Sequence, residues 1–493
     1  MDDVGTAGEL RLRDPGLLRD KAFIDGRWCA GEGSRSFAVE NPADGSVIGH
    51  VADLGRAETQ AAIEAAARAF PAWRKKTAKE RAAVLRAWYD QIIANQEDLA
   101  RLMTAEQGKS LTESRGEVVY GAAFVEWFAE EGKRVYGDVI PTFAGNRRIV
   151  VLKEPIGVTA AITPWNFPIA MITRKVSPAL AAGCTSVIKP AKLTPLSALA
   201  LAVLAERAGM PKGVLNIVPS ARASEIGEEL CTNPAVRKVS VTGSTEIGKL
   251  VMKMCAGTVK KVSLELGGNA PFIVFDDADL DAAVAGALAS KYRNSGQTCV
   301  CANRLLVQDG VYDAFAGKLA EAVRALKVGP GAEPGVQQGP LINEAAVTKC
   351  EEHIEDALAK GGRIVVGGKR HALGGTFFEP TVLADVNPQM KVAREETFGP
   401  VAPLFRFARE EEAIAMANDT EFGLASYFYT RDLARTWRVA EALEYGIVGI
   451  NEGIISTEVA PFGGIKESGI GREGSRYGIE DYCEIKYVCI GGL

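Results

Sequence analysis

Two cysteines one residue apart, Cys299 and Cys301, lie in the stretch RNSGQTCVCANR and raise the question of thiol chemistry. A catalytic thiol is usually activated by histidine, but the chain has only three histidines, and none lies near Cys299 in the sequence. Small and polar residues surround Cys299, whereas structural cysteines are typically buried in apolar segments. Either the two thiols are inert, or a base of another kind activates one of them.

A carboxylate is one candidate for that base. Glu265 lies in the apolar run VSLELGGNAPFIVF, where burying a charge is unfavourable unless the group is paired or functional. Desolvation would raise the pKa of this carboxyl toward the range that suits a general base. A structural carboxylate that accepts hydrogen bonds from backbone amides would give the same pattern, so the residues alone leave both roles open.

A side-chain amide is a further candidate group. The segment TPWNFP places Asn166 between Pro164 and Pro168, which restrict the backbone of the turn. An amide is a neutral hydrogen-bond donor and is suited to stabilising an oxyanion. The alternative is a turn asparagine without a catalytic task.

Two segments suit a nucleotide, although the sequence has no GxGxxG motif. VTGSTEIG places Gly243 and Ser244 between an expected strand and an expected helix, where free N–H groups bind phosphate. TSVIKPAKLTP ends an expected strand with Lys189 and Lys192, near the edge at which parallel sheets bind ligands. An ordinary strand-to-helix turn and two solvated lysines are the alternatives.

The elements that must position these residues follow from an alternating pattern between about residues 157 and 307. Short β-rich runs such as GVTAAIT, TSVIKP, GVLNIVP and KVSVTG alternate with segments rich in alanine and leucine, such as TPLSALALAVLAERAG. This alternation predicts a parallel sheet with crossover helices, which is a doubly wound α/β domain. A second α/β block is expected from Asp276 to about Asn451.

Three other segments have clear expected structures. Residues 55–135 are predicted to be mainly helical, and residues 279–296 to form a helix that ends at Gly296, just before Cys299. The terminal DYCEIKYVCIGGL is predicted to be a strand. Its exposed edge would pair either within the chain or with another subunit.

Length and composition restrict the classes of function. A chain of 493 residues is expected to form two or three domains. The net charge of −5 and the pI of about 5.6 argue against nucleic acid or an anionic membrane as a partner. The uncharged run at 156–173 has prolines and an asparagine, so we expect no membrane span, and the amino terminus lacks the pattern of a signal peptide. Nine cysteines without a CxxC pair favour a reducing compartment, hence the cytoplasm, and no metal site.

Six segments resemble, in the same order, the motifs of the aldehyde dehydrogenase superfamily: TPWNFP, KPAKLTP, VTGSTEIG, LELGGNAP, GQTCVCANR and EETFGP. The resemblance extends from NPADGSVI (41–48) to PFGGIKESGIGREG (461–474). Within the superfamily, PWNFPIAMITRKVSPALAAGC, NEGIIS, GREGSRYGIEDYCEIKYVC and the residues around Arg293 look most like those of succinate-semialdehyde dehydrogenases. Tyr292 stands where that pattern has phenylalanine.

The resemblance implies an α/β fold with a Rossmann-type cofactor domain, an α/β catalytic domain and a small β oligomerisation element. Residues 1–132 and 154–261 are expected to form a discontinuous dinucleotide-binding domain. Residues 262–455 are expected to form the catalytic domain, and 133–153 with 474–493 the oligomerisation segments. A homo-oligomer, either dimer or tetramer, is the expected assembly.

The resemblance also implies roles for the reactive residues. Cys299 is the expected nucleophile, Glu265 the base that acts through water, and Asn166 with the Cys299 backbone N–H the oxyanion site. Hydride passes to a nicotinamide, with Glu396 on its ribose and Phe398 beside its ring, and leaves a thioester for hydrolysis. The full set of expected cofactor contacts is Thr163, Pro164, Trp165, Asn166, Lys189, Pro190, Ala191, Lys192, Gly243, Ser244, Leu266, Glu396 and Phe398.

The sequence departs from the common pattern of the family at Lys192. NAD-preferring relatives often have glutamate there, which bonds the adenosine ribose, whereas a lysine would attract the extra phosphate of NADP. NADP is therefore the expected cofactor, with NAD as the alternative. Arg174, Arg293 and Ser456 match the positions expected to hold a distal carboxylate, although arginines more often form structural ion pairs.

The expected reaction is oxidation of succinate semialdehyde to succinate. Glutarate semialdehyde, one methylene longer, or a broader range of aldehydes are alternatives, because pockets separate homologues by only about 10–200-fold. Acyl transfer to CoA and a non-catalytic, structural use of the fold are alternatives of other classes. Cys301 is expected either to form a reversible disulfide with Cys299 or to be a small buried thiol.

Overall fold

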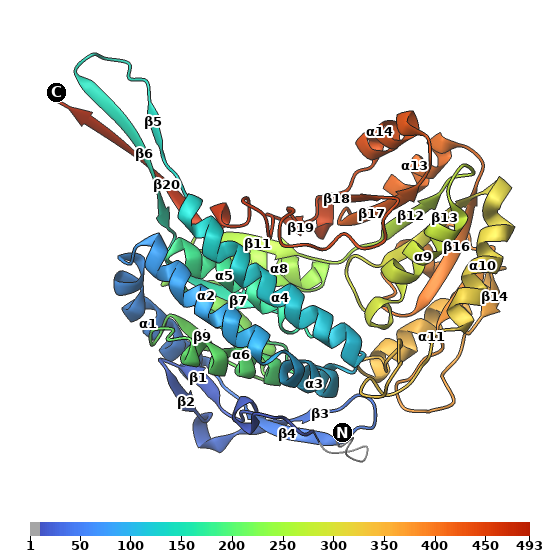
Figure 1. Ribbon diagram of the computed structural model, residues 1–493, viewed down its shortest axis with the longest axis horizontal. Helices are drawn as coiled ribbons and strands as arrows, with labels where there is room; N and C mark the ends of the chain where they lie inside the picture. The colour runs from blue at the N-terminus through green and yellow to red at the C-terminus, as the bar shows by residue number, and fades with distance from the viewer. Residues whose placement is uncertain (1–9) are drawn as a thin grey trace.

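Two large β-sheets form the centres of two lobes, and a three-stranded sheet projects from the first lobe as an arm (Figure 1). The structure is a computed structural model that describes residues 10–493, so the first nine residues of the expected cofactor-binding segment lie outside it. The α/β fold class expected from the sequence is confirmed. None of the helices within residues 10–493 is long and apolar enough to cross a membrane.

The first lobe is built on an eight-stranded sheet with the strand order β19-β11-β10-β7-β8-β9-β1-β2. From β11 to β9 neighbouring strands are parallel, and the chain runs from β7 to β8 to β9 on one side and to β10 and β11 on the other. This reversal beside β7 is the kind of point at which open α/β sheets bind ligands, outside the carboxyl ends of the strands. The strands are β1 (Ala22–Ile24), β2 (Arg27–Cys29), β7 (Val158–Ile162), β8 (Thr185–Lys189), β9 (Leu215–Ile217), β10 (Val236–Thr242), β11 (Lys261–Glu265) and β19 (Gly469–Ile470).

Helices cover both faces of this sheet, as its nearly continuous apolar strands require. Helix α6 is buried along most of its length between the sheet and α2, which fits its run of alanine and leucine on all sides. Helix α4 packs closely against α5, the helix that contains Arg174. The helices are α1 (Arg56–Arg74), α2 (Ala78–Ala94), α3 (Gln96–Gln107), α4 (Leu111–Glu131), α5 (Ala170–Ala182), α6 (Pro195–Arg207), α7 (Ala223–Thr232) and α8 (Thr245–Ala256).

The second lobe is built on a seven-stranded sheet with the order β14-β15-β16-β13-β12-β17-β18, in which every pair except β14–β15 is parallel. Its strands are β12 (Ala270–Val274), β13 (Ala302–Gln308), β14 (Arg363–Val366), β15 (Thr381–Ala384), β16 (Val401–Phe407), β17 (Ala425–Tyr429) and β18 (Ile447–Ile450). Its helices are α9 (Leu280–Lys291), α10 (Tyr312–Arg324), α11 (Glu344–Ala359), α12 (Lys391–Arg394), α13 (Glu410–Asn418) and α14 (Leu433–Ala442).

The arm contains the carboxyl-terminal strand predicted from the sequence. Strand β20 (Cys483–Gly491) pairs antiparallel with β6 (Arg147–Pro155), which also pairs with β5 (Asp138–Ile140). The terminal strand therefore pairs within the chain through one of its edges. A separate two-stranded sheet consists of β3 (Ser36–Glu40) and β4 (Val47–Ala52).

The helix expected over residues 279–296 is shorter than predicted. Helix α9 begins after its N-cap Asp279 and ends at Lys291, and a 3₁₀ turn at Arg293–Gly296 follows. Within that turn Asn294 has a φ of 51°, because its side chain and backbone are hydrogen-bonded to distant segments rather than to the helix. The expectation that Gly296 ends the helix was therefore wrong.

Candidate active site

Cys299 lies in the loop before β13, where the amino ends of the second sheet meet the carboxyl ends of the first. A Cβ on Gly268 would lie 2.6 Å from the Cys299 carbonyl oxygen, so the glycine allows the two loops to touch. The thiol is half-buried, and burial raises its pKa to about 12, although the charge of Arg174 opposes the rise. The resting side chain is therefore a neutral thiol at pH 7.

Glu265 ends β11 and is buried at this junction of the lobes. Its Oε2 has no hydrogen-bond partner among the described residues, so backbone amides do not satisfy the whole carboxylate. Burial raises the pKa of Glu265 well above its ordinary value, and the negative charge of Glu473 adds to the rise. A carboxyl of this kind gains a proton easily and is suited to acting as a base toward water.

Asn166 lies in the turn before α5 and is held beside the cysteine loop. Its side-chain Nδ2 donates to the Gln297 carbonyl at 3.1 Å, while its Oδ1 has no partner among the described groups. An amide nitrogen has two hydrogens, so one is left to donate to an oxyanion near Cys299.

A buried ion pair fixes the backbone of that turn. Lys109 Nζ donates to Glu117 Oε2 at 2.5 Å and to the Asn166 carbonyl at 2.6 Å. Glu117 Oε1 accepts from the backbone N–H groups of Ile169 and Ala170, at the start of α5, at 2.9 and 3.2 Å. Both side chains are almost fully buried. The pair therefore joins α4 to the segment that contains Asn166.

A second set of hydrogen bonds joins the same turn to the cysteine loop. Asn294 Nδ2 donates to the carbonyls of Asn166 and Gln297, at 3.0 and 3.2 Å. The Asn294 backbone N–H donates to Glu113 at 2.7 Å, and Gln107 Nε2 donates to Asn294 Oδ1 at 3.0 Å. Asn294 thus connects the elements on which Asn166 and Cys299 lie.

The expected cofactor residues of the first lobe meet at the carboxyl ends of neighbouring strands. Thr163, Lys189, Gly243 and Leu266 end or follow β7, β8, β10 and β11. Ser244 is the N-cap of α8, and a Cβ on Gly243 would meet no atom within 4 Å. This helix N-terminus is therefore open, and its geometry suits a phosphate.

The two lysines at this edge have different environments. Lys189 is buried, its Nζ donates to the Pro190 carbonyl at 3.1 Å, and burial lowers its pKa to about 8. Lys192 is exposed and forms no ion pair with another described residue. Between them lies Ala191, half-buried. The structure thus leaves the charge of Lys192 available to an anionic ligand.

Residues of the second lobe reach the same edge. Glu396 Oε1 accepts from the Gly268 N–H at 3.2 Å, and burial raises its pKa to about 7. Phe398 has a φ of 54°, and its ring stands edge-on to Trp165 with the centroids 5.7 Å apart. This edge fits a nicotinamide dinucleotide: it has an open helix N-terminus for a phosphate, an acid for the ribose hydroxyls and two aromatic rings for a planar group.

Two of the three residues expected to hold a distal carboxylate line one small cavity. Arg293 and Ser456 lie on its wall together with Thr298 and Val300, which flank Cys299. Arg174 is not part of that lining.

Arg174 is instead buried in an ion pair with Glu473. Its guanidinium also lies over the ring of Phe462 at 4.1 Å. Its Nη2 has no hydrogen-bond partner among the described residues, so the ion pair does not use all of its donors.

No motif in the sequence indicates a role for Glu473 or Lys175. Lys175 Nζ donates to Glu473 Oε1 at 2.5 Å and to Ser240 Oγ at 3.3 Å. Burial acts to raise the pKa of Glu473, but the charges of Arg174 and Lys175 outweigh it and hold the pKa below its ordinary value. Glu473 lies in the segment GIGREG, whose residues give no indication that its charge acts on Glu265.

Cys301 is buried, and its thiol donates to the Lys291 carbonyl at 3.6 Å. Both Cys299 and Cys301 are free thiols in this structure. The reversible disulfide between them stays a prediction.

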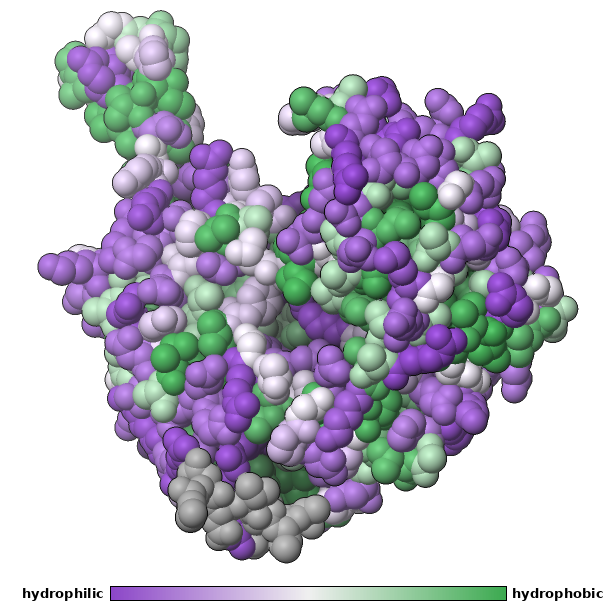
Figure 2. Space-filling model, turned by 45° about the vertical axis from the view of Figure 1, so that its right-hand side comes forward, coloured by the Kyte–Doolittle hydropathy of each residue, from purple (hydrophilic) through white to green (hydrophobic). Residues whose placement is uncertain are grey.

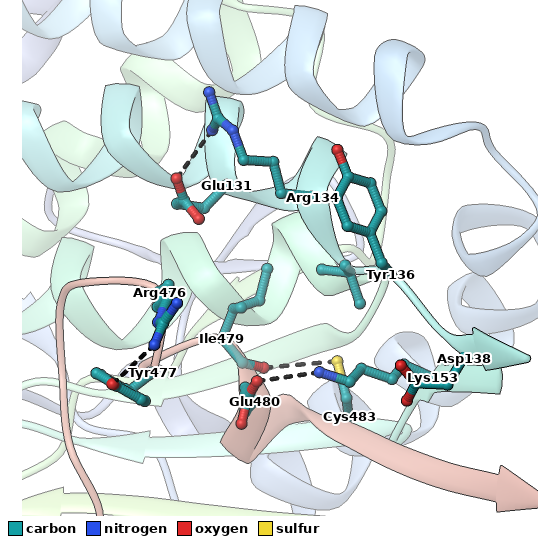
Figure 3. Close-up of a pocket in the computed structure, with 11 residues that line it drawn as sticks. Glu131, Arg134, Tyr136, Asp138, Lys153, Arg476, Tyr477, Ile479, Glu480 and Cys483 are labelled. Atoms are coloured by element: carbon teal, nitrogen blue, oxygen red, sulfur yellow. Dashed lines mark hydrogen bonds and ion pairs between the residues drawn. The ribbon is translucent and has the colours of Figure 1, made fainter. Parts of the chain in front are cut away.

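A second cavity, of about 450 Å³, lies at the root of the arm (Figure 3). Four of the charged groups in its lining form ion pairs with one another: Arg134 with Glu131 at 2.8 Å, and Lys153 with Glu480 at 3.0 Å. It therefore offers no reactive set comparable to that around Cys299. In the part of the chain that is described, no three His, Cys, Asp or Glu residues are grouped to hold a metal ion.

The comparisons with known proteins give one consistent result. The model of the aldehyde dehydrogenase family matches residues 28–488. A glutarate-semialdehyde dehydrogenase of Pseudomonas aeruginosa is 66% identical, over 98% of this chain and 100% of the relative. The NADP(+) succinate-semialdehyde dehydrogenase of Escherichia coli is 65% identical, over 98% and 100%. The crystal structure of succinate-semialdehyde dehydrogenase from Burkholderia pseudomallei has a TM-score of 0.97 at 66% identity, over 98% and 100% of the two chains.

Proposed function

The chain belongs to the aldehyde dehydrogenase family, and we propose that it oxidises succinate semialdehyde to succinate with reduction of a nicotinamide dinucleotide. The observation that carries this substrate is the cavity shared by Arg293 and Ser456 beside the Cys299 loop. A cation and a hydroxyl at that place suit an aldehyde with a carboxylate at its far end.

Cys299 forms the covalent bond to the substrate. The thiol first releases its proton to solvent water; the sulfur then adds to the aldehyde carbon, and the carbonyl oxygen becomes an oxyanion. The free hydrogen of Asn166 Nδ2 and the Cys299 backbone N–H donate to that oxygen. Arg174 contributes the nearby positive charge that favours the thiolate.

Glu265 completes the reaction. The bound dinucleotide supplies the hydride acceptor, so that the acyl group remains on Cys299 as a thioester. Glu265 then takes a proton from water, the oxygen attacks the acyl carbon, and the carbon–sulfur bond breaks to release succinate and the thiolate. This use of water favours hydrolysis over acyl transfer to CoA, and an assay of the rate with and without CoA tests that choice.

NADP is the preferred cofactor in this proposal. Lys192 is exposed at the cofactor edge without an ionic partner among the described residues, and its charge complements a 2′-phosphate. The cited Escherichia coli relative has a name that specifies NADP(+). Ser244, Glu396 and Phe398 are assigned to the pyrophosphate, the ribose and the nicotinamide ring, respectively.

The name of a second relative favours another candidate substrate. The cited Pseudomonas aeruginosa relative is named for glutarate semialdehyde, which presents the same two functional groups one methylene further apart. Differences of one methylene change kcat/KM by about 10–200-fold, so both acids are expected to react at different rates.

The variant Arg293→Ala tests the substrate class. Loss of a hydrogen bond to a charged group is expected to lower kcat/KM for succinate semialdehyde by about 10–100-fold. Butanal, which has the same chain length without the carboxylate, serves as the control on the same variant and is expected to lose less than about 2-fold. Equal losses for both aldehydes would contradict the proposed pocket.

We assign dinucleotide binding to residues 1–132 and 154–261, catalysis to 262–455, and assembly of a dimer or tetramer to 133–153 and 474–493. Support for the assembly comes from the arm, where apolar side chains are exposed (Figure 2). The exposed fraction is 78% for Val139 and 72% for Ile485. Apolar patches of this kind mark interfaces between proteins, and a second copy of the chain is the assigned partner.

A further inference from the structure

The hydroxyl of Tyr120 is buried and has no hydrogen-bond partner among the described residues. Native proteins pair most buried polar atoms, so an unpaired hydroxyl of this kind requires an explanation. Burial raises the pKa of Tyr120, which keeps the phenol protonated at neutral pH. The group is therefore a neutral hydrogen-bond donor without an acceptor.

Tyr120 lies on α4 and packs against the wall of the substrate site. Its ring touches the cluster of Phe167, Ala170 and Met171, which follows Asn166 in the chain. It also stands edge-on to Phe124, with the ring centroids 5.0 Å apart. The side chain thus lies between α4 and the start of α5.

The same rings position two arginines. The guanidinium of Arg174 lies over Phe124 at 5.6 Å, and its Nη1 is 3.8 Å from the sulfur of Met171. The guanidinium of Arg293 lies over Phe167 at 4.9 Å. Tyr120 therefore shares aromatic or sulfur neighbours with both arginines.

Each of these three side chains has a buried donor without an acceptor: Arg174 Nη2, Arg293 Nε and the Tyr120 hydroxyl. They come from α5, from the turn before Cys299 and from α4. Electrostatic interactions link the Tyr120 hydroxyl to both guanidinium groups, to the Glu473 carboxylate that pairs with Arg174, and to the Cys299 thiol. A carboxylate accepts about four hydrogen bonds, so a bound acid group could satisfy these three unpaired donors around Cys299.

We propose that Tyr120 is a specificity-determining residue whose hydroxyl donates a hydrogen bond to the distal carboxylate of the substrate, beside Arg174 and Arg293. The inference rests on the proposed function and extends it with a residue outside the expected set. When a buried donor binds an oxygen of the substrate, an analogue that lacks this oxygen leaves the donor unpaired and therefore binds more weakly.

The test compares Tyr120→Phe with the unchanged enzyme on succinate semialdehyde and on butanal. Tyr120→Phe keeps the ring and removes only the oxygen, so the fold and the edge-on contact with Phe124 are expected to persist. We expect kcat/KM for succinate semialdehyde to fall by about 10–100-fold, mainly through KM, and that for butanal to change by less than about 2-fold. Inhibition by succinate, measured with butanal as substrate, is expected to weaken by a similar factor.

A matched control is Trp127→Phe, on the same helix two turns further on. The Trp127 indole Nε1 is also buried and without a partner, but none of the acid-binding contacts above involves it. The variant Trp127→Phe is expected to leave kcat/KM unchanged for both succinate semialdehyde and butanal. Equal losses for both aldehydes in Tyr120→Phe, or the same discrimination in Trp127→Phe, would overturn the inference.

The two proposals fail separately. If Arg293→Ala discriminates between the aldehydes and Tyr120→Phe does not, the role of Tyr120 is wrong and the proposed substrate class stands. If neither variant discriminates, both the carboxylate pocket and the role of Tyr120 are wrong.

Discussion

Burial shifts the proton affinities of Cys299 and Glu265 in the same direction, although one is the assigned nucleophile and the other the assigned base. Both groups are therefore neutral more readily than in water, and each needs a nearby charge to become active. The positive charge of Arg174 opposes the rise in pKa at both groups. Arg174 itself forms an ion pair with Glu473. Glu473 is thus expected to set the pH at which Glu265 acts.

The variant Glu473→Gln is expected to move the acidic limb of thioester hydrolysis to lower pH. In the proposed mechanism Glu265 acts as a base only when it is deprotonated, so the rate of hydrolysis is expected to rise with pH through its pKa. Removal of the Glu473 charge removes a contribution that raises this pKa, and it leaves the charges of Arg174 and Lys175, which lower it. Single-turnover hydrolysis measured against pH checks the direction, and an upward shift of the limb would contradict the assignment.

The proposed preference for NADP also depends on a single residue, Lys192. The unchanged enzyme is expected to have the higher kcat/KM with NADP, and Lys192→Glu to reverse the preference by about 10–100-fold, because the new carboxylate repels the 2′-phosphate. Steady-state titration with both dinucleotides measures this, and Lys192→Met separates loss of attraction from added repulsion. A preference for NAD in the unchanged enzyme would contradict the proposal that Lys192 attracts the 2′-phosphate of NADP.

At the scale of elements, the ion pair of Lys109 and Glu117 joins α4 to the Asn166 turn and to the start of α5. Breaking one member of a buried pair leaves the other charge unpaired and costs about 3–5 kcal/mol of stability. Apolar replacement of both members is often neutral for stability. Variants of this pair can therefore separate its effect on the position of the Asn166 turn from its effect on the stability of the protein.

Glu117→Gln is expected to lower the free energy of unfolding by about 3 kcal/mol and to lower kcat as well. The double variant Lys109→Met, Glu117→Leu is expected to regain most of the stability but not kcat, because the Asn166 carbonyl loses the Lys109 donor and keeps only that of Asn294. Thermal unfolding and kcat of the single and double variants measure both effects. Arg115→Gln removes an exposed pair with Glu97, 2.7 Å long, and is the control, with an expected change below about 1 kcal/mol. Recovery of kcat together with stability would contradict the positioning role.

The strands and helices around the first sheet follow from local sequence. Short apolar runs between helical segments predicted β7, β8, β9 and β10, because strands that are buried on both faces are apolar along their length. The residues expected to bind the cofactor lie at the carboxyl ends of these strands, since parallel strands bring their ends to one edge.

Other parts of the site depend on contacts between distant segments. The early end of α9 results from hydrogen bonds of Asn294 to Glu113 and Gln107, far away in the sequence. Pairing of Arg174 with Glu473, and the unpaired hydroxyl of Tyr120, likewise arise only when α4, α5 and the carboxyl-terminal segment meet. No spacing or periodicity within one segment indicates such contacts.

At the scale of the whole molecule, the arm extends away from both lobes and presents apolar side chains. The double variant Val139→Glu, Ile485→Glu is expected to yield a species of lower mass than the unchanged protein, because two charges replace apolar contact area. Light scattering after size-exclusion chromatography measures the mass. Val47→Glu, at an exposed position of β4, is the control and is expected to leave the mass unchanged. A monomeric unchanged protein would contradict the assigned assembly.

Covalent capture of the acyl group tests the chemistry most directly. In Glu265→Gln the carboxylate proposed to activate water is absent, so one turnover of succinate semialdehyde with NADP is expected to leave the enzyme acylated. Mass spectrometry of the digested protein is expected to place a succinyl group on the peptide of Cys299 and nowhere else. An unmodified Cys299, with product formed at the normal rate or with the adduct on another residue, would contradict the account.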